Sequence, residues 1–404
     1  MAARPAPPDR HHALVERIEP HAAGQGPLAG LTFVAKDCLD LKGRAPGCGL
    51  ASRGPGPAPA EDAAVIRQLA SAGAELIGMA QMTPLAFEPS GDNPALGRPL
   101  NPRGASYVCG GSSSGSAVAV AAGLADLSIG TDTAGSVRIP AHCCGIAAWK
   151  PGPGILPRDG VMMLAESLDC VGILASEVDL LARVAAAIEV MPKAPFGGLA
   201  LAVDALAASA PAVRQACEAA ARIARVSVRA VQALPLIRAC DQPVFALLQG
   251  EAYQANRHRI TSGGLDPELA RRLAKGAASS EADLAAARAE LAVLAQDALD
   301  MVLAEDEVLA LPGMPCETPR VALCDPASPD FSPRALYALS AYTRFANGLG
   351  LCVVSLPVGL DSQGMPVGLQ LVARQGRDAD LIAFAARLAA ALPIRFSTIP
   401  GPAP

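Results

Sequence analysis

The stretch from Gly110 to Arg138 constrains the fold more than any other part of the chain. It reads GGSSSGSAVAVAAGLADLSIGTDTAGSVR, so two turns rich in glycine and serine flank the apolar run Ala117–Leu124. An unbroken apolar run belongs in a protein interior, and one that starts just beyond a glycine turn predicts a buried helix. We therefore expect rigid buried elements to carry both polar turns, which is where preorganised catalytic groups are usually built.

The second turn combines a serine with backbone groups that can converge on one point. Thr131–Ser136 reads TDTAGS after a short apolar run, and the small residues Ala134 and Gly135 allow consecutive backbone N–H groups to converge on one point. Such a nest stabilises a developing oxyanion, and Ser136 would stand beside it as a nucleophile. The earlier turn, Gly110–Ser116, contains enough glycine to adopt an unusual backbone, including a cis peptide.

A serine nucleophile needs a base, and the five histidines of the chain offer little. His142 follows Ser136 closely, but neither His142 nor His258 has an evident carboxylate to orient it. A lysine in the interior loses its proton readily and can serve instead. Lys36 ends a compact β-prone run, whereas Lys150 ends a shorter one. The residues alone leave a catalytic Lys36 and a solvated surface Lys36 both open.

Strand-like and helical patterns alternate along the rest of the chain. Strands are expected at Leu31–Ala35, Glu75–Met79, Leu127–Gly130, Leu199–Val203, Val226–Val231, Glu307–Leu311, Leu351–Leu356 and Val367–Ala373. Helices are expected at Glu61–Ala72, Glu177–Val190, Ala212–Ala224, Ala282–Leu303, Pro333–Asn347 and Asp378–Leu392. The alternation favours an α/β fold with a central mixed, mostly parallel sheet that is covered by helices.

The chain shows no linker that is long or biased enough to separate domains. We therefore expect a single domain over residues 1–404, with a short N-terminal arm at 1–25, a core at 26–174 and the remainder at 175–404. The arm contains a weak helical patch at Ala13–Ile18. Met82–Cys109 and Gly145–Pro157 are rich in proline and glycine, and we expect both to be irregular.

The composition excludes several classes of protein. The formal net charge is −5, and no run of Lys or Arg offers a surface for nucleic acid or an anionic membrane. No uncharged apolar run reaches the roughly 18 residues that a membrane span needs. Eleven cysteines without CxxC spacing favour a reduced, cytoplasmic setting. The few histidines lack ligands at metal spacing, so no metal site is expected. The sequence permits a homodimer.

Three motifs in this order resemble a known family. LTFVAKD, GGSSSGS and GTDTAGSVRIPAHCCG are similar to the signature of the amidase signature family, serine hydrolases that cleave carboxylic amides through a Ser, cis-Ser, Lys triad. The resemblance is dense over residues 26–174. It continues more thinly at Leu351–Ala373, where GLCVVSLPVG precedes MPVGLQLVAR. The family implies an α/β fold, hydrolysis of a small-molecule amide and no cofactor.

The resemblance also implies a role for individual residues. The nucleophile falls on Ser136, the bridging cis-serine on Ser112 and the base on Lys36. The oxyanion donors fall on the backbone of Thr133, Ala134, Gly135 and Ser136, and positions that support the turns fall on Ser113, Asp132 and Arg138. Ala134 stands where the family more often has glycine, and His142 and Cys143 stand where it more often has serine and an aromatic residue.

Two alternatives remain beside a stand-alone amidase. By resemblance, the same fold also serves as the ammonia-producing subunit of an amidotransferase, which works with a partner protein. GSSSG also matches the GxSxG elbow of α/β-hydrolase esterases, with Ser113 as the nucleophile. The loops that would form the substrate pocket contain Met82, Phe87 and Met162, which predict a largely apolar cavity. Nearby Cys109, Cys143 and Cys144 are expected to be buried, inert thiols.

Overall fold

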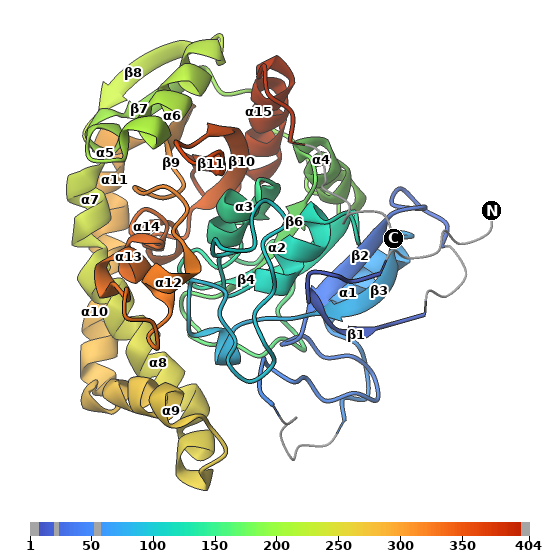
Figure 1. Ribbon diagram of the computed structural model, residues 1–404. Coiled ribbons are helices and arrows are strands. Elements are labelled where there is room, and N and C mark those ends of the chain that lie inside the picture. Colours follow the sequence, from blue (N-terminus) through green and yellow to red (C-terminus); the bar gives the residue numbers. More distant parts are fainter. Residues whose placement is uncertain (1–7, 20–23, 52–57, 397–404) are drawn as a thin grey trace.

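The computed structural model describes residues 8–19, 24–51 and 58–396, and one sheet of eleven strands runs through it (Figure 1). From one edge to the other the strands are β1 (Leu14–Arg17), β3 (Glu75–Ala80), β2 (Thr32–Lys36), β4 (Leu127–Asp132), β6 (Cys170–Ala175), β5 (Ala147–Lys150), β10 (Cys352–Leu360), β11 (Pro366–Ala373), β9 (Glu307–Pro312), β7 (Gly198–Ala202) and β8 (Ser227–Val231). Helices pack on this sheet, and the α/β fold with a mixed sheet is confirmed.

The expectation of a mostly parallel sheet is wrong. Six of the ten pairings between neighbouring strands in the described chain are antiparallel. The parallel pairings are confined to β3–β2–β4 and β9–β7–β8. Part of the error has a local cause, because β5 lies in a stretch expected to be irregular and β6 was not predicted. One or both of these strands take part in three of the six antiparallel pairings.

The expected βαβ unit near the N-terminus is present. Strand β2 leads into helix α1 (Ala64–Ser71) and then into β3, which lies parallel to β2. The segment Ala13–Ile18 is not helical as expected, because the residues Leu14–Arg17 pair antiparallel with β3 as the edge strand β1. The side chain of Asp9 holds the entry to this strand by accepting hydrogen bonds from the N–H groups of His11, Ala13 and Leu14.

Helices cover both faces of the sheet, and the alternation of strand residues decides which face each side chain joins. In β2, Phe33 and Ala35 pack into the main core, whereas Val34 packs into a separate core on the opposite face. The helices of the main core are α1, α4 (Val178–Ala187), α6 (Pro211–Ile223) and α15 (Asp378–Ala391). The opposite face carries α2 (Ser114–Ala121), α3 (Arg138–Cys144), α8 (Asp241–Ser262) and α10 (Glu281–Val293).

The remaining helices are short or join these longer ones. They are α5 (Val203–Ala207), α7 (Leu234–Ala239), α9 (Pro267–Ala274), α11 (Leu299–Val302), α12 (Val321–Cys324), α13 (Pro333–Ala338) and α14 (Arg344–Gly348), with 3₁₀ turns at Pro84–Ala86 and Lys275–Ala278 and a π turn at Leu294–Ala298. The π turn continues α10 into α11, as expected for Ala282–Leu303. The single helix expected at Pro333–Asn347 is instead divided into α13 and α14.

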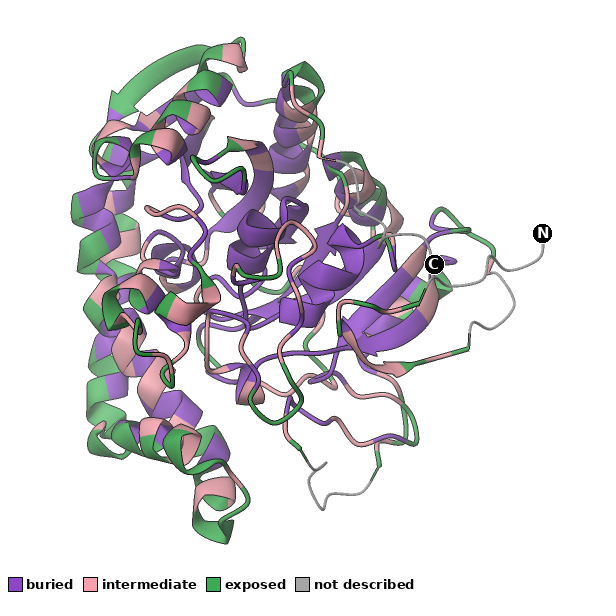
Figure 2. Ribbon diagram, in the orientation of Figure 1, coloured by how far each residue is buried: buried purple, intermediate pink, exposed green. Residues whose placement is uncertain are grey.

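Helices α2 and α3 follow the two polar turns of the Gly110–Arg138 stretch. All eight residues of α2 are buried, as the apolar run predicted, and every residue of α3 is buried as well (Figure 2). Helix α3 ends at Gly145, whose left-handed φ of 69° lets its N–H bond the carbonyl of Ala141. Both turns are therefore anchored in the protein interior.

Candidate active site

Lys36 lies at the end of β2, where its side chain enters the space between the two polar turns. Its Nζ is 2.7 Å from Oγ of Ser112 and 2.7 Å from Oγ1 of Thr131. Lys36 and Ser112 are both fully buried, which excludes the surface position that the sequence had left open. The structure therefore brings Lys36 and Ser112 together, as the motifs predicted.

The first turn is tied to the second through the backbone. The peptide bond between Gly111 and Ser112 is cis. The N–H of the next residue, Ser113, donates to the carbonyl of Ser136 at 3.1 Å. Oγ of Ser113 donates to the carbonyl of Thr131 and accepts from the N–H of Thr131. Ser113 therefore holds the two turns in a fixed position relative to each other.

The position of Ser113 argues against the esterase alternative. Its side chain is fully buried, both of its hydroxyl contacts are to the backbone of β4, and it does not line the cavity over Ser136 among the described residues. A nucleophile must reach the substrate. The match of GSSSG to a hydrolase elbow is therefore a coincidence of composition.

Burial also sets the proton affinity of Lys36. Loss of hydration lowers the pKa of the Lys36 ammonium below its usual value, and the nearby Cys38, Asp169 and Asp132 oppose that shift only in part. A larger fraction of Lys36 is therefore in the neutral amine form, which can accept a proton, than would be the case at the surface. Lys150, the other lysine considered as a base, does not share the hydroxyl contacts of Lys36. Its Nζ donates to the backbone carbonyls of Pro151 and Leu351.

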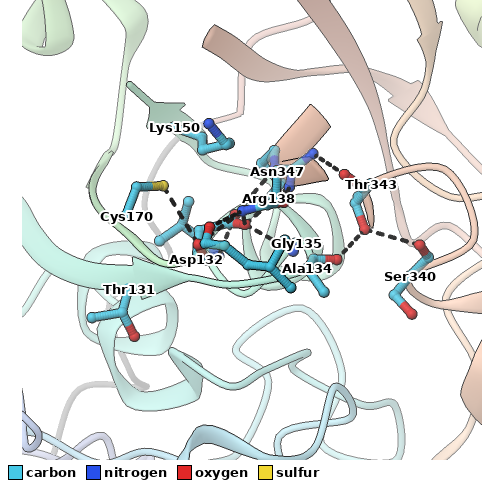
Figure 3. Close-up of polar contacts among 12 residues, drawn as sticks. Thr131, Asp132, Ala134, Gly135, Arg138, Lys150, Cys170, Ser340, Thr343 and Asn347 are labelled. Carbon is cyan, nitrogen blue, oxygen red and sulfur yellow. Dashed lines mark hydrogen bonds and ion pairs between the residues drawn. The ribbon is translucent and has the colours of Figure 1, made fainter. Parts of the chain in front are cut away.

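The second turn is held by Asp132 and Arg138, which form a buried, bidentate ion pair (Figure 3). The carboxylate of Asp132 also accepts from the N–H groups of Gly135 at 2.8 Å and Val137 at 3.1 Å. Burial opposes ionisation of Asp132, but the charge and hydrogen bonds of Arg138 outweigh it and lower the pKa of Asp132. The pair clamps the turn on both sides of Ser136.

Three residues distant in sequence complete the clamp. Arg138 donates to the carbonyl of Thr343, to Oε1 of Gln370 and to Oδ1 of Asn347. Asn347 in turn donates to the carbonyl and to Oδ1 of Asp132 (Figure 3). These residues come from α14, the turn before it and β11, and no local motif in the sequence marks them.

The hydrogen bond from Gly135 changes the expected set of oxyanion donors. Its N–H is already donated to Asp132, so Gly135 does not fit the role that the resemblance implied. Within the described chain, no hydrogen bond occupies the N–H groups of Thr133, Ala134 or Ser136. The carbonyl of Ala134 accepts from Oγ1 of Thr343, which orients the middle of the turn.

A cavity of about 100 Å³ opens over Ser136. Its lining includes the backbone turn and a largely apolar wall that is formed by Ala86, Phe87, Pro89, Ile139, Leu164, Phe245, Leu248 and Tyr337. Phe87 was expected there. Met82 was expected as well but is fully buried in the main core, and Met162 packs against the same core, where its N–H bonds the carbonyl of Cys38. Neither methionine lines this cavity among the described residues.

Asp169 is a further buried acid that the sequence analysis missed. Its Oδ2 accepts from the N–H groups of Leu164 at 2.6 Å and Ala165 at 3.0 Å, whereas Oδ1 has no partner in the described structure. Burial raises the pKa of Asp169 to about 6, against the opposing effects of the Thr133 side chain, these backbone hydrogen bonds and the nearby charge of Lys36. Asp169 also lines a second cavity of about 280 Å³. It directly precedes β6, so prediction of that strand would have placed it at a strand end.

The nearby histidine and cysteines do not provide a base or a nucleophile. Burial lowers the pKa of His142 to about 3, and its Nδ1 accepts a hydrogen bond from the N–H of Gly368 on β11. Burial raises the pKa of Cys109 to about 12 and that of Cys143 and Cys144 well above the usual thiol value. His142 is therefore neutral at physiological pH, and the three thiols are buried, as expected.

Two broader expectations can be compared with the described residues 8–19, 24–51 and 58–396. Across these ranges, no cluster of three or more histidine, cysteine or acidic side chains is arranged to hold a metal ion. The helices in the same ranges are all too short or too polar to cross a bilayer.

Comparisons with known proteins agree with this geometry. A family model described as Amidase matches residues 9–227 and 208–382. The chain is 32% identical over 416 residues to Amidase 1 of Oryza sativa subsp. japonica, and this alignment covers 91% of this chain and 92% of that protein. It is 30% identical to a glutamyl-tRNA(Gln) amidotransferase subunit of Koribacter versatilis, over 88% of this chain and 83% of that protein. A crystal structure of an amidase superimposes with a TM-score of 0.82 at 30% identity, over 91% of this chain and 86% of the other.

Proposed function

Because the chain belongs to the amidase family, we propose that it hydrolyses a carboxylic amide through Ser136, Ser112 and Lys36. Ser136 is the nucleophile, Ser112 passes protons and Lys36 is the terminal base. The contact that carries the proposal is the one between the buried Nζ of Lys36 and Oγ of Ser112, 2.7 Å apart. A cavity with an apolar wall above Ser136 supports a small-molecule amide as the substrate.

The first half-reaction forms an acyl-enzyme. The lone pair of neutral Lys36 accepts the hydroxyl proton of Ser112, and Ser112 takes the proton of Ser136 as Oγ of Ser136 attacks the amide carbon. The C–O bond forms while the carbonyl π bond breaks, which leaves a negative charge on the former carbonyl oxygen. When this intermediate collapses, the C–N bond breaks and the proton returns along the relay to the leaving nitrogen.

The second half-reaction uses the same groups with water as the nucleophile. Water gives its proton to Oγ of Ser112, whose own proton moves to Lys36, and the water oxygen attacks the acyl carbon. The bond to Ser136 then breaks, and the relay returns the proton to Oγ of Ser136. The products are the carboxylic acid and the amine or ammonia, and the enzyme is regenerated.

The unpaired backbone donors of the second turn stabilise the oxyanion in both steps. The N–H groups of Thr133, Ala134 and Ser136 are available for this role, whereas that of Gly135 is engaged by Asp132. The methyl group of Ala134 leaves its backbone donor in place, so replacement of the commoner glycine is compatible with activity. Each correctly placed donor contributes several kcal/mol, about 2.7–4 in a well-studied case.

The test is a hydrolysis screen of aliphatic, aryl and amino-acid amides with the purified chain. Ser136→Ala and Lys36→Ala should each lower kcat/KM by at least about a thousandfold, because the members of a relay act as a unit. Ser114→Ala is the matched control, since Oγ of Ser114 is buried without a hydrogen-bond partner two residues after Ser112. If Ser113→Ala abolished turnover and Lys36→Ala spared it, the assignment would be wrong.

A second candidate is the ammonia-producing subunit of an amidotransferase. The observation that favours it is the similarity to an amidotransferase component along most of both chains. That role predicts that glutaminase activity appears only when a partner protein is added. Hydrolysis of an amide by the single purified chain at a rate typical of enzymes, about 1–10³ s⁻¹, would exclude it.

Two further proposals concern the chain as a whole. Residues 1–404 form one domain, which is supported by a single sheet whose strands extend from Leu14 to Ala373. The protein acts in the cytoplasm, which is supported by eleven cysteines that are all free thiols.

A further inference from the structure

Three charged side chains interrupt the apolar wall of the cavity over Ser136. They are Glu88 from the loop after β3, Arg272 from α9 and Lys275 from the following 3₁₀ turn. A purely aliphatic or aryl amide would offer these charged groups no partner of opposite sign. Their number and sign determine what kind of group the outer part of the cavity can bind.

Arg272 is held beside the cavity by Phe87. Its guanidinium carbon lies 5.4 Å from the centre of the Phe87 ring, and Nη2 donates to the carbonyl of Phe87 at 3.4 Å. An arginine that stacks on an aromatic ring keeps most of its N–H donors free for a planar anion. Because Phe87 itself lines the cavity, this contact fixes the cation at the wall of the substrate site.

Glu88 forms no ion pair with Arg272 among the described residues, although the charge of Arg272 acts on its carboxylate. Its carboxylate turns toward its own loop, where it accepts from the N–H and Oγ of Ser90, both at 2.9 Å, and from the N–H of Gly91 at 3.2 Å. Neither Arg272 nor Lys275 forms an ion pair in the described part of the chain. The charged lining of the cavity therefore consists of one carboxylate, which is hydrogen-bonded within its own loop, and two cations without an ion-pair partner. Its net charge is positive.

The neighbouring arginine shows what a structural cation on the same helix looks like. Arg271 forms a bidentate pair with Glu268 one turn earlier, with N···O distances of 2.6 and 2.8 Å, and it is exposed. It does not line the cavity among the described residues. Of these two adjacent arginines, Arg272 lines the cavity and has no acidic partner, whereas Arg271 has an acidic partner and does not line the cavity.

We infer that the preferred substrate is an amide that carries a carboxylate group remote from the scissile bond. The apolar wall binds the hydrocarbon part, Ser136 attacks the amide end, and Arg272 with Lys275 binds the carboxylate end. This inference rests on the proposed amide hydrolysis. Charge-assisted hydrogen bonds from arginine to a carboxylate are short and strong, so the charged end should contribute substantially to substrate selection.

Matched pairs of amides test the inference directly. The monoamides of succinic, adipic and suberic acid are compared with butanamide, hexanamide and octanamide, which have the same chain lengths but lack the carboxylate. For at least one length, kcat/KM of the acid should exceed that of the neutral amide by about tenfold or more. Arg272→Gln should reduce this ratio at least about tenfold, and the ratio should also fall as salt screens the exposed Lys275.

Arg271→Gln is the matched control and should leave the ratio unchanged. A ratio at or below one for all three lengths, or a ratio that Arg272→Gln does not alter, would overturn the inference. If no amide is turned over above the Ser136→Ala blank, the proposed function fails. The carboxylate site is then tested independently, by measuring the binding of a carboxylate ligand. Calorimetric titration of Ser136→Ala protein with the corresponding dicarboxylates should then show binding that Arg272→Gln weakens at least tenfold, and absence of binding would overturn it.

Discussion

Lys36 and Ser112 are separated by 76 positions in the sequence, yet Nζ of Lys36 lies 2.7 Å from Oγ of Ser112. The contact depends on the sheet, because β2 presents Lys36 beside β4, its parallel neighbour, and Thr131 of β4 supplies the second oxygen around Nζ. Lys36 and Ser112 therefore meet only in the folded protein, where both side chains are fully buried.

The pH dependence of the reaction should report the ionisation of Lys36. Its pKa in the folded protein is lowered by burial, and the proposed relay needs the neutral amine. The value of kcat/KM should therefore fall as the pH drops through this lowered pKa, and should level off above it. A profile measured on one neutral amide from mildly acidic to alkaline pH tests this, and a rate independent of pH would contradict a lysine base.

Asp169 should shift that profile through its charge. The ionised carboxylate raises the pKa of Lys36 and so opposes the effect of burial. Asp169→Asn removes the charge and keeps an oxygen for the N–H groups of Leu164 and Ala165, so the acidic limb of the profile should move to lower pH. An unchanged limb with a lower plateau would instead indicate a purely structural role.

Gly135 should not tolerate a side chain. Its φ is 125°, and an added Cβ would lie 2.3 Å from Oγ1 of Thr343, which itself holds the carbonyl of Ala134. Gly135→Ala should therefore reduce the free energy of unfolding by at least about 2 kcal/mol and displace the turn that carries Ser136. Gly264→Ala, where the nearest atom is 3.8 Å away, is the control and should change stability by less than about 0.5 kcal/mol. Equal stability of the two variants would refute the steric argument.

The parts of this architecture that follow from local patterns could be predicted. The β2–α1–β3 unit follows a clear apolar pattern, and the buried helix α2 follows from its apolar run. The motifs also predicted that Lys36 and Ser112 lie close together, as they do. Strand β5 reads AAWK and has weak intrinsic strand preference, so it depends on pairing with β6 and β10. Pairing between distant strands also made the sheet more antiparallel than the alternation of elements suggested.

The contributions from distant segments could not be predicted. Arg138 bonds Gln370 across 232 positions, and Arg272 reaches Phe87 across 185. Neither partner lies in a motif, and a charged helix such as α9 has the same pattern whether an arginine faces solvent or a cavity. The position of Asp169 depends on β6, whose short apolar run does not distinguish a strand from a buried helix.

The buried pair of Asp132 and Arg138 leads to a prediction about stability. Asp132→Asn leaves the Arg138 guanidinium buried without its counter-charge, and loss of one partner from such a pair costs about 3–5 kcal/mol. Glu166→Gln is the control, because the pair of Glu166 with Arg158 is exposed and should contribute less than about 1 kcal/mol. Urea denaturation at neutral pH measures both variants.

The same pair should make the protein sensitive to acid. Because the pKa of Asp132 is lower in the folded state, its ionised form contributes stability that is present above the pKa of the unfolded chain, about 3.9, and is lost as the pH falls below that value. The free energy of unfolding of the native protein should therefore decrease steeply below about pH 4, whereas Asp132→Asn should show a shallower decrease from a lower starting value. Denaturation series at stepwise lower pH on both proteins give the two slopes. The buried contacts of Asp132 with Arg138, Gly135 and Val137 identify its carboxylate as a group whose protonation destabilises the fold. If the variant lost stability with acid as steeply as the native protein, this identification would be wrong.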